Sequence, residues 1–274
     1  EDIKSQVIKS GQISNYHKFY NEVAEKEIES YLSEDKDKKA RDLYLKYKLD
    51  NQHKYGTKSV YFLRAVMLEN EYYSSKSRYK KAIKREDKLK EEIEKVIPYD
   101  NLAQLQFNDH FYNFYSKNNR IEEARIERET NEWIAGLNMS KNAPNYSIEK
   151  IKLADFNIKN QDKFAEAKAV YEQHFEGVFR KQFHSHHPIY SEFLESYSLL
   201  KTSIDEYDEA YRLAGERLKI ANEKYGPESK DYAMALIQLS EINILKGEYD
   251  QAESQLEVAS EMIKSESSKK SRAY

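Results

Sequence analysis

One alanine recurs along almost the whole chain at a nearly constant spacing. Its six copies lie 42, 42, 43, 43 and 42 residues apart, and they are Ala40, Ala82, Ala124, Ala167, Ala210 and Ala252. Three residues before each of the last five stands a large apolar or aromatic residue: Tyr79, Ile121, Phe164, Tyr207 and Tyr249. The first copy has Asp37 at that place, so the first unit is degenerate. A spacing this regular is typical of a stacked repeat protein.

The last unit shows what one repeat contains. Apolar residues keep helical spacing on both sides of Gly247, a residue that suits the C-terminal turn of a helix. Each unit is therefore predicted to be a helix, a short turn and a second helix. Ser240 and Ala252 are expected to meet where the two helices cross, and Tyr249 is expected to fill the space beside them.

The spacing predicts an all-α solenoid of about six antiparallel helical hairpins in a single domain over residues 1–264. The first helices are expected near residues 16–32, 58–74, 101–117, 146–160, 189–204 and 230–246. The second helices are expected near 36–52, 78–96, 120–138, 163–182, 206–224 and 248–264. The units then span about 16–56, 57–99, 100–144, 145–187, 188–227 and 228–264. Residues 265–274, rich in Ser and Lys, are expected to form a frayed or disordered tail.

The turns between units support this register. All four prolines of the chain, Pro98, Pro144, Pro188 and Pro227, fall in these turns, where they interrupt no proposed helix. Lys54-Tyr55-Gly56 ends the first unit and Lys224-Tyr225-Gly226 ends the fifth. Glycine at such a place can adopt the left-handed conformation that closes a helix.

Composition excludes several classes of function. The 45 basic and 48 acidic residues nearly balance, so no global basic field is available for nucleic acid. The chain has no cysteine, which excludes disulfides and thiolate metal sites. No apolar run approaches the length that spans a membrane, and no signal-peptide pattern is present. We expect a cytoplasmic protein, although the composition also fits the periplasm. Abundant Lys, Asn, Ile and Tyr suggests an AT-rich bacterial genome.

The pattern resembles the tetratricopeptide repeat family. The matching features are the small residue of the first helix, the aromatic residue of the second helix and the alanine three residues after it. Residues 221–228, Ala-Asn-Glu-Lys-Tyr-Gly-Pro-Glu, followed by Asp231-Tyr232-Ala233, look like the family's glycine loop leading into a new first helix. Residues 183–190 are a looser copy. A period near 42 is similar to that of kinesin light chains and of arrays that precede caspase-like protease domains in bacteria.

This resemblance, which covers about residues 16–264, implies a right-handed superhelix that binds a peptide or protein on the concave face of its first helices. The expected partner-binding residues are Arg64, Glu71, Gln106, Asp109, Asn113, Glu192, Glu195, Met234, Ile237 and Glu241. Kinesin light chains carry a recurring asparagine on the first helix, and this chain has Ile237, Glu195 and Asp109 at the corresponding places. Their peptide specificity is therefore not carried over.

Aromatic side chains are further candidates for anchoring a partner. They are Tyr61, Tyr72, Tyr73, Tyr112, Tyr115 and Trp133. Trp133 differs from the others because it lies on a second helix, where packing in the core or between units is the favoured interpretation.

Residue patterns for catalysis or for metal binding are weak. His184, His186 and His187 are close together, but a polar turn between units is favoured over a zinc or nickel site, and no metal is expected. The other histidines, including His110, are expected to be surface or partly packed residues. The basic stretch from Lys80 to Lys90 is interpreted as a solvated face that nearby acidic residues, including Glu86, offset. No enzyme activity and no cofactor are expected.

The sequence thus favours a non-enzymatic scaffold for a protein or peptide partner. Two alternatives stay open. The array can be the regulatory arm of a larger bacterial enzyme such as a caspase-like protease, or it can be a receptor for a signalling peptide that changes its superhelical pitch.

Overall fold

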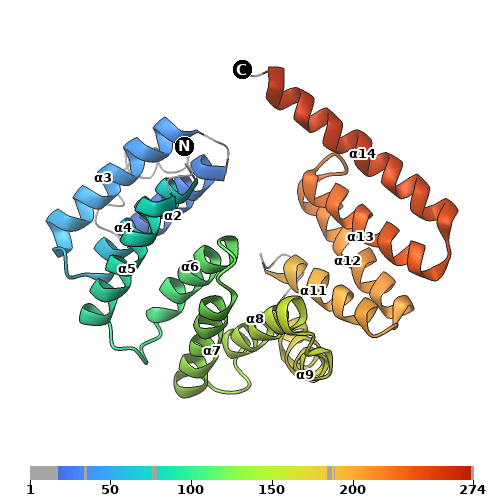
Figure 1. Ribbon diagram of the computed structural model, residues 1–274, viewed down its shortest axis with the longest axis horizontal. Coiled ribbons are helices and arrows are strands. Elements are labelled where there is room, and N and C mark those ends of the chain that lie inside the picture. The colour runs from blue at the N-terminus through green and yellow to red at the C-terminus, as the bar shows by residue number, and fades with distance from the viewer. Residues whose placement is uncertain (1–17, 34–35, 76–78, 184–186, 188, 273–274) are drawn as a thin grey trace. The chain divides into compact units, whose positions relative to one another are not determined.

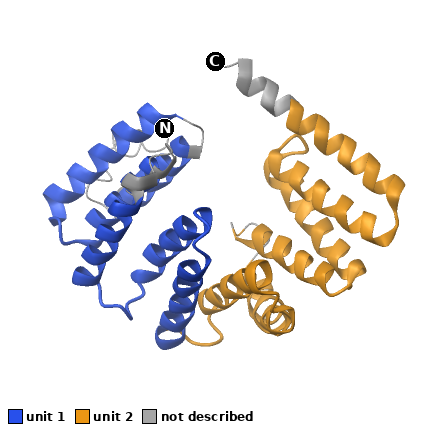
Figure 2. Ribbon diagram, viewed as in Figure 1, with its two compact units in different colours: residues 1–138 blue, residues 139–274 orange. Residues whose placement is uncertain are grey.

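The computed structural model describes residues 18–33, 36–75, 79–183, 187 and 189–272 (Figure 1). Every regular element in these ranges is a helix. The chain divides into two compact units, residues 1–138 and residues 139–274 (Figure 2). The single domain over residues 1–264 that the sequence favours stays a prediction.

Unit 1 contains three helical hairpins in its described residues. α2 (Lys18–Ser33) pairs with α3 (Asp37–Tyr55), α4 (Val60–Ser75) with α5 (Tyr79–Val96), and α6 (Gln104–Lys117) with α7 (Ile121–Asn138). Figure 1 shows the helices of a hairpin running side by side in opposite directions. α4 also packs against α2, α3 and α6, which joins successive hairpins within the unit.

Unit 2 likewise contains three hairpins in the part that the structure describes. The first pairs α8 (Pro144–Gln161) with a second helix in three segments, α9 (Phe164–Val170), η1 (Tyr171–Phe179) and α10 (Arg180–Gln182). The others pair α11 (Tyr190–Ser203) with α12 (Tyr207–Tyr225), and α13 (Lys230–Lys246) with α14 (Tyr249–Arg272). Each helix expected from the repeat spacing is therefore found close to its expected place.

The recurrent alanine is a packing residue, as expected. Its side chain is buried in the five copies whose side chains are described: Ala40, Ala124, Ala167, Ala210 and Ala252. The side chain of Ala82 lies outside the described ones. In the fifth hairpin the Ser198 hydroxyl donates to the carbonyl oxygen of Ala210 at 2.9 Å. The small residues of the two helices therefore do meet at the crossing, because only small side chains let the backbones approach this closely.

The expected role of Tyr249 is wrong. Its side chain is 67% exposed, whereas the equivalent Tyr207 packs in a cluster with Leu239 and Ile242 of the following hairpin. The difference has a simple cause. α14 is the last helix that the structure describes, so no described hairpin follows to cover Tyr249.

The helix C-termini use glycine as the sequence predicts. Gly56 follows α3 and Gly226 follows α12, with φ of 76° and 85°. These values lie in the region that residues with a side chain rarely adopt. Pro144 is the first residue of α8, where its missing N–H costs no intrahelical hydrogen bond.

The second helix of the fourth hairpin departs from regular α geometry over η1, which is a π-helix of nine residues. The sequence contains the reason. The interval from Ala167 to Ser198 is 31 positions, one more than the equivalent interval from Ala210 to Ser240. A π-helical stretch takes up one extra residue without breaking the helix. Phe175 and Phe179 of this stretch are fully buried and pack against Phe193 of α11.

The C-terminal end of α14 differs from the sequence expectation. The Ser- and Lys-rich stretch was expected to fray from residue 265, but the helix continues to Arg272. The stretch contains neither glycine nor proline, so nothing in it stops a helix locally. Within the described ranges, no helix combines the length and the apolar character needed to cross a membrane.

Candidate functional site

The expected binding residues share three positions of the repeat. They lie 18, 15 or 11 residues before a recurrent alanine, so they are separated by three and four residues along a first helix. Residues with this spacing lie on one side of an α-helix. We call this side the first-helix face; it carries Arg64, Glu71, Gln106, Asp109 and Asn113 in unit 1, and Glu192, Glu195, Met234, Ile237 and Glu241 in unit 2.

Arg64 is held by its own chain. Its guanidinium forms an ion pair with Glu25 of α2, and both side chains are largely buried. The hydroxyl of Tyr47 on α3 also donates to Glu25. Burial raises the pKa of Glu25 even though the Arg64 charge opposes this shift. Arg64 therefore joins neighbouring first helices, and it is poorly placed to bind a partner.

Glu71 belongs to a second network, centred on His110 of α6. The His110 Nδ1 lies 3.1 Å from the Glu71 carboxylate, and Nε2 lies 2.9 Å from the carboxylate of Glu86 on α5. Burial alone lowers the pKa of His110, but its hydrogen bonds and ion pairs with Glu71 and Glu86 outweigh this and raise the pKa to about 9. The imidazole is therefore charged at neutral pH.

This network corrects two sequence interpretations. His110 is buried, although it was expected to be a surface or partly packed residue. Glu86 was expected to offset surface lysines, yet it is 1% exposed and accepts a hydrogen bond from Asn70 at 3.2 Å. The buried Glu86 and the partly exposed Glu71 flank the buried His110, and this pairing of opposite charges explains why His110 and Glu86 are tolerated inside.

The remaining positions of unit 1 divide into bound and accessible residues. Asp109 forms an ion pair with Arg128 of α7 and accepts a hydrogen bond from Asn131 at 3.2 Å. Gln106 and Asn113 are exposed. Of the expected positions in unit 1, these two neutral side chains are therefore the exposed ones.

In unit 2 Glu195 is likewise tied to its neighbours. Arg217 of α12 forms an ion pair with the Glu195 carboxylate at 2.7 Å, and Gln238 of α13 donates to the Glu195 carbonyl oxygen at 3.0 Å. Arg217 also donates to Gln238 at 3.0 Å. These three residues connect α11, α12 and α13.

The first-helix face of unit 2 is otherwise open and partly apolar. Glu192 and Glu241 are exposed, Met234 is 40% exposed, and Ile237 is half-buried. The structure adds Leu199, which is 41% exposed and lies 11 residues before Ala210, like Glu241 before Ala252. The repeat position itself is the signal that could have identified Leu199 from the sequence.

Most aromatic candidates contact their own chain. Tyr61 packs on Tyr55, Tyr72 packs on Tyr44, Arg85 lies over Tyr73, Arg128 lies over Tyr112, and Tyr115 is buried. Trp133 was expected to pack in the core or between units. It is 41% exposed and stacks on Tyr99 of the preceding repeat unit, with 5.5 Å between ring centroids, so it packs between units.

The structure describes one of the three clustered histidines, His187. His184 and His186 lie outside the described residues. The His187 ring packs against Phe179 and Phe183, and burial together with the nearby Lys224 charge lowers its pKa. The described residues contain no group of side chains arranged to hold a metal ion.

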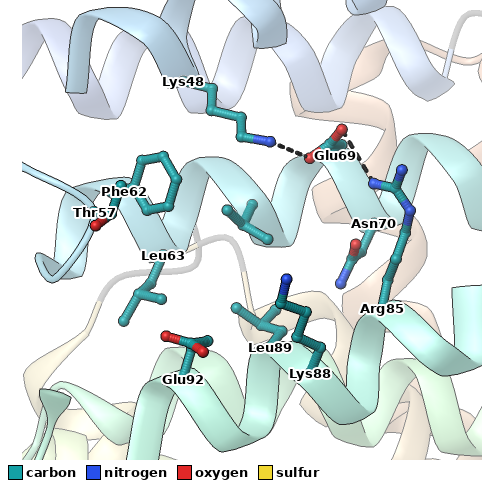
Figure 3. Close-up of a pocket in the computed structure, with 11 residues that line it drawn as sticks. Lys48, Thr57, Phe62, Leu63, Glu69, Asn70, Arg85, Lys88, Leu89 and Glu92 are labelled. Atoms are coloured by element: carbon teal, nitrogen blue, oxygen red, sulfur yellow. Dashed lines mark hydrogen bonds and ion pairs between the residues drawn. The ribbon is translucent and has the colours of Figure 1, made fainter. Parts of the chain in front are cut away.

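A cavity of about 550 Å³ lies in unit 1 between α3, α4 and α5 (Figure 3). α4 lines it with Phe62, Val66 and Glu69, which project from the side of the helix opposite Arg64 and Glu71. The cavity is therefore separate from the first-helix face. No sequence pattern had indicated it.

Two solved structures of repeat proteins resemble this chain. A Podosopora anserina protein with nearly identical TPR-like repeats, assigned as a kinesin light chain and solved in a variant form, matches with a TM-score of 0.59 and 17% sequence identity. The match covers 73% of this chain and 93% of that chain. BtubC (BKLC) from P. vanneervenii matches with a TM-score of 0.61 and 15% identity, over 90% of this chain and 92% of that chain.

The chain has a tetratricopeptide-like helical-repeat fold. The all-α repeat architecture expected from the alanine spacing is thereby confirmed. No protein-family model matches the chain, and no curated protein matches it in sequence.

Proposed function

We propose that the protein is a non-catalytic scaffold that binds a segment of another protein on its first-helix faces. The observation that carries the proposal is the open surface of α11 and α13. Leu199, Met234 and Ile237 are accessible there although they are apolar, and the exposed carboxylates of Glu192 and Glu241 share the face with them. Accessible apolar side chains rimmed by charges are typical of protein-binding surfaces.

The chemistry of this face favours one kind of partner segment. Apolar side chains of the partner would bury against Met234 and Leu199, and basic side chains would lie near Glu192 and Glu241. Burial of a few such anchors supplies most of the binding energy, while the charges set orientation and partner choice. We therefore expect a segment that alternates apolar and basic residues.

A peptide selection on the intact chain tests the proposal. Peptides enriched from a random library are titrated against Met234→Lys and, as a matched control, Leu256→Lys on α14. The two side chains are equally exposed, at 40%, but only Met234 lies on the first-helix face. We expect Met234→Lys to weaken binding at least about tenfold because it removes an anchor and repels basic residues. Leu256→Lys should leave the affinity unchanged, and equal effects of the two variants would contradict the proposal.

A further inference from the structure

The cavity between α3, α4 and α5 has an apolar part and a polar part. Phe62, Leu63, Val66 and Leu89 form apolar wall, whereas Asn70, Arg85 and Lys88 are polar. In Figure 3 the ammonium group of Lys88 points from α5 toward the middle of the cavity, and Asn70 and Arg85 lie together at one end. A volume of about 550 Å³ is in the range of small-ligand sites, which is roughly 300–1,000 Å³.

Most charges in the cavity already have partners. The carboxylate of Glu69 lies 2.6 Å from the Lys48 ammonium and 3.1 Å from the Arg85 guanidinium. Glu92 forms an ion pair with Lys95 at 3.4 Å. Lys88, in contrast, has no hydrogen-bonding or ionic partner among the described residues. Lys88 is an exposed residue, so its positive charge is accessible to a ligand.

Asn70 supplies a second unsatisfied group. Its side chain is fully buried. Its amide nitrogen donates a hydrogen bond to Glu86, and its amide oxygen takes no part in that bond. That oxygen is buried and has no hydrogen-bond donor. An unpaired buried acceptor costs roughly 1–3 kcal/mol, and a ligand that donates an N–H or O–H to it recovers this cost.

The equivalent place one repeat later shows that these features belong to this cavity and not to the fold in general. A smaller cavity of about 130 Å³ lies between α5, α6 and α7. Lys90 there occupies the position of Lys48, but Thr130 replaces Lys88 and Tyr112 replaces Asn70, each 42 residues on. The second cavity therefore has neither an unpaired ammonium group like that of Lys88 nor an unpaired acceptor like the amide oxygen of Asn70.

We propose that the cavity between α3, α4 and α5 binds a carboxylate ligand that also carries an N–H donor, with the carboxylate on Lys88 and the N–H on the Asn70 amide oxygen. An acidic residue has both groups, and its methylenes would lie against Leu89 and Val66. It can come from a free acidic amino acid or from an acidic segment of a protein. This site is additional to the first-helix faces and has the opposite charge preference.

Titration of the isotopically labelled intact chain, followed by NMR, tests the proposal. The probes are N-acetyl-glutamate N-methylamide, its glutamine analogue, and free glutamate. We expect the glutamate probe to bind at least about tenfold more tightly than the glutamine analogue, because a charge-assisted hydrogen bond is lost in the latter. Stronger binding of the blocked probe than of free glutamate would assign the site to a protein segment, and the reverse order would assign it to a small molecule.

Variants locate the binding in the cavity. Lys88→Gln should abolish the preference for glutamate over glutamine. Lys84→Gln should keep it, because Lys84 is likewise exposed and lies one turn earlier on α5 but does not line the cavity. A probe with methylated amide nitrogens should bind several-fold more weakly to the unaltered protein, because it cannot donate to Asn70. Absence of glutamate binding at millimolar concentration, or undiminished preference in Lys88→Gln, would overturn the proposal.

Discussion

At the scale of the residue, charged side chains of the first helices mainly form ion pairs with other residues of the same chain. Arg64 pairs with Glu25, Glu71 with His110, and both pairs join residues 39 positions apart. A separation just short of one repeat places the two members on neighbouring first helices. Partly buried pairs of this kind help to set how one hairpin packs on the next, because loss of one member leaves the other charged and unpaired.

His110 makes this packing sensitive to pH. Its pKa of about 9 in the folded protein lies above the ordinary value of 6.5. A raised folded pKa contributes stability that is complete below pH 6.5 and is lost as the pH rises through about 9. We expect the free energy of unfolding to fall by on the order of 2 kcal/mol across this interval.

Urea unfolding at a series of pH values measures this effect. His110→Gln should remove most of the decline, because no group at that position then changes its charge. His53→Gln, at an exposed site, should show the same decline as the unaltered protein. An unchanged pH dependence in His110→Gln would mean that His110 is not the group responsible.

The sequence predicts packing residues far better than polar pairs. The spacing alone identifies Ala210 and its partner Ser198, because a small residue is needed wherever two helices cross closely. The pairing of His110 with Glu71 and Glu86 could not be predicted from the spacing, since it depends on which helices become neighbours in the fold. Opposite charges 36 to 39 residues apart, as in Lys168–Glu206 and Arg180–Glu216, are the signal that could have suggested such pairs.

At the scale of the element, helix length is set by local signals that the sequence shows plainly. α3 and α12 each have 19 residues and each end before a glycine with positive φ. The π-helical stretch η1 was not predicted, because a single inserted residue can be placed in a loop as easily as in a helix. In this chain the burial of Phe175 and Phe179 keeps the inserted residue inside the helix.

Replacing either of two glycines in one hairpin by alanine should change the stability of the protein, in opposite directions for the two positions. Gly215 lies inside α12, and a Cβ at this position would meet nothing within 4 Å. Gly215→Ala should stabilise the protein by about 0.5–1 kcal/mol, because alanine loses less entropy in a helix. Gly226→Ala should destabilise it by about 1 kcal/mol, because φ there is 85°.

The midpoints of urea unfolding should therefore move in opposite directions for the two variants. Since each replaces glycine by alanine, any common effect on the unfolded chain largely cancels in the comparison. Shifts of the same sign would show that backbone conformation does not control the end of α12.

At the scale of the whole molecule, the repeat predicts the class of fold but not the partner. Solved repeat structures match the chain with 15% and 17% identity, which shows the fold alone. The first-helix positions follow from the period, but their role in binding a partner stays a prediction. Which of those positions are accessible could not be predicted, and the structure separates the exposed Gln106 and Met234 from Arg64, which is largely buried in its ion pair with Glu25.

The most direct test of the scaffold proposal is to locate a bound peptide by photo-cross-linking. A photoreactive side chain is placed at Glu241 on the first-helix face of α13 or, as a control, at Glu257 on α14; both positions are exposed. The selected peptide is then added and the cross-linked product is measured by mass spectrometry. We predict cross-linking from position 241 and little from position 257. Cross-linking mainly from position 257 would contradict the assignment of binding to the first helices.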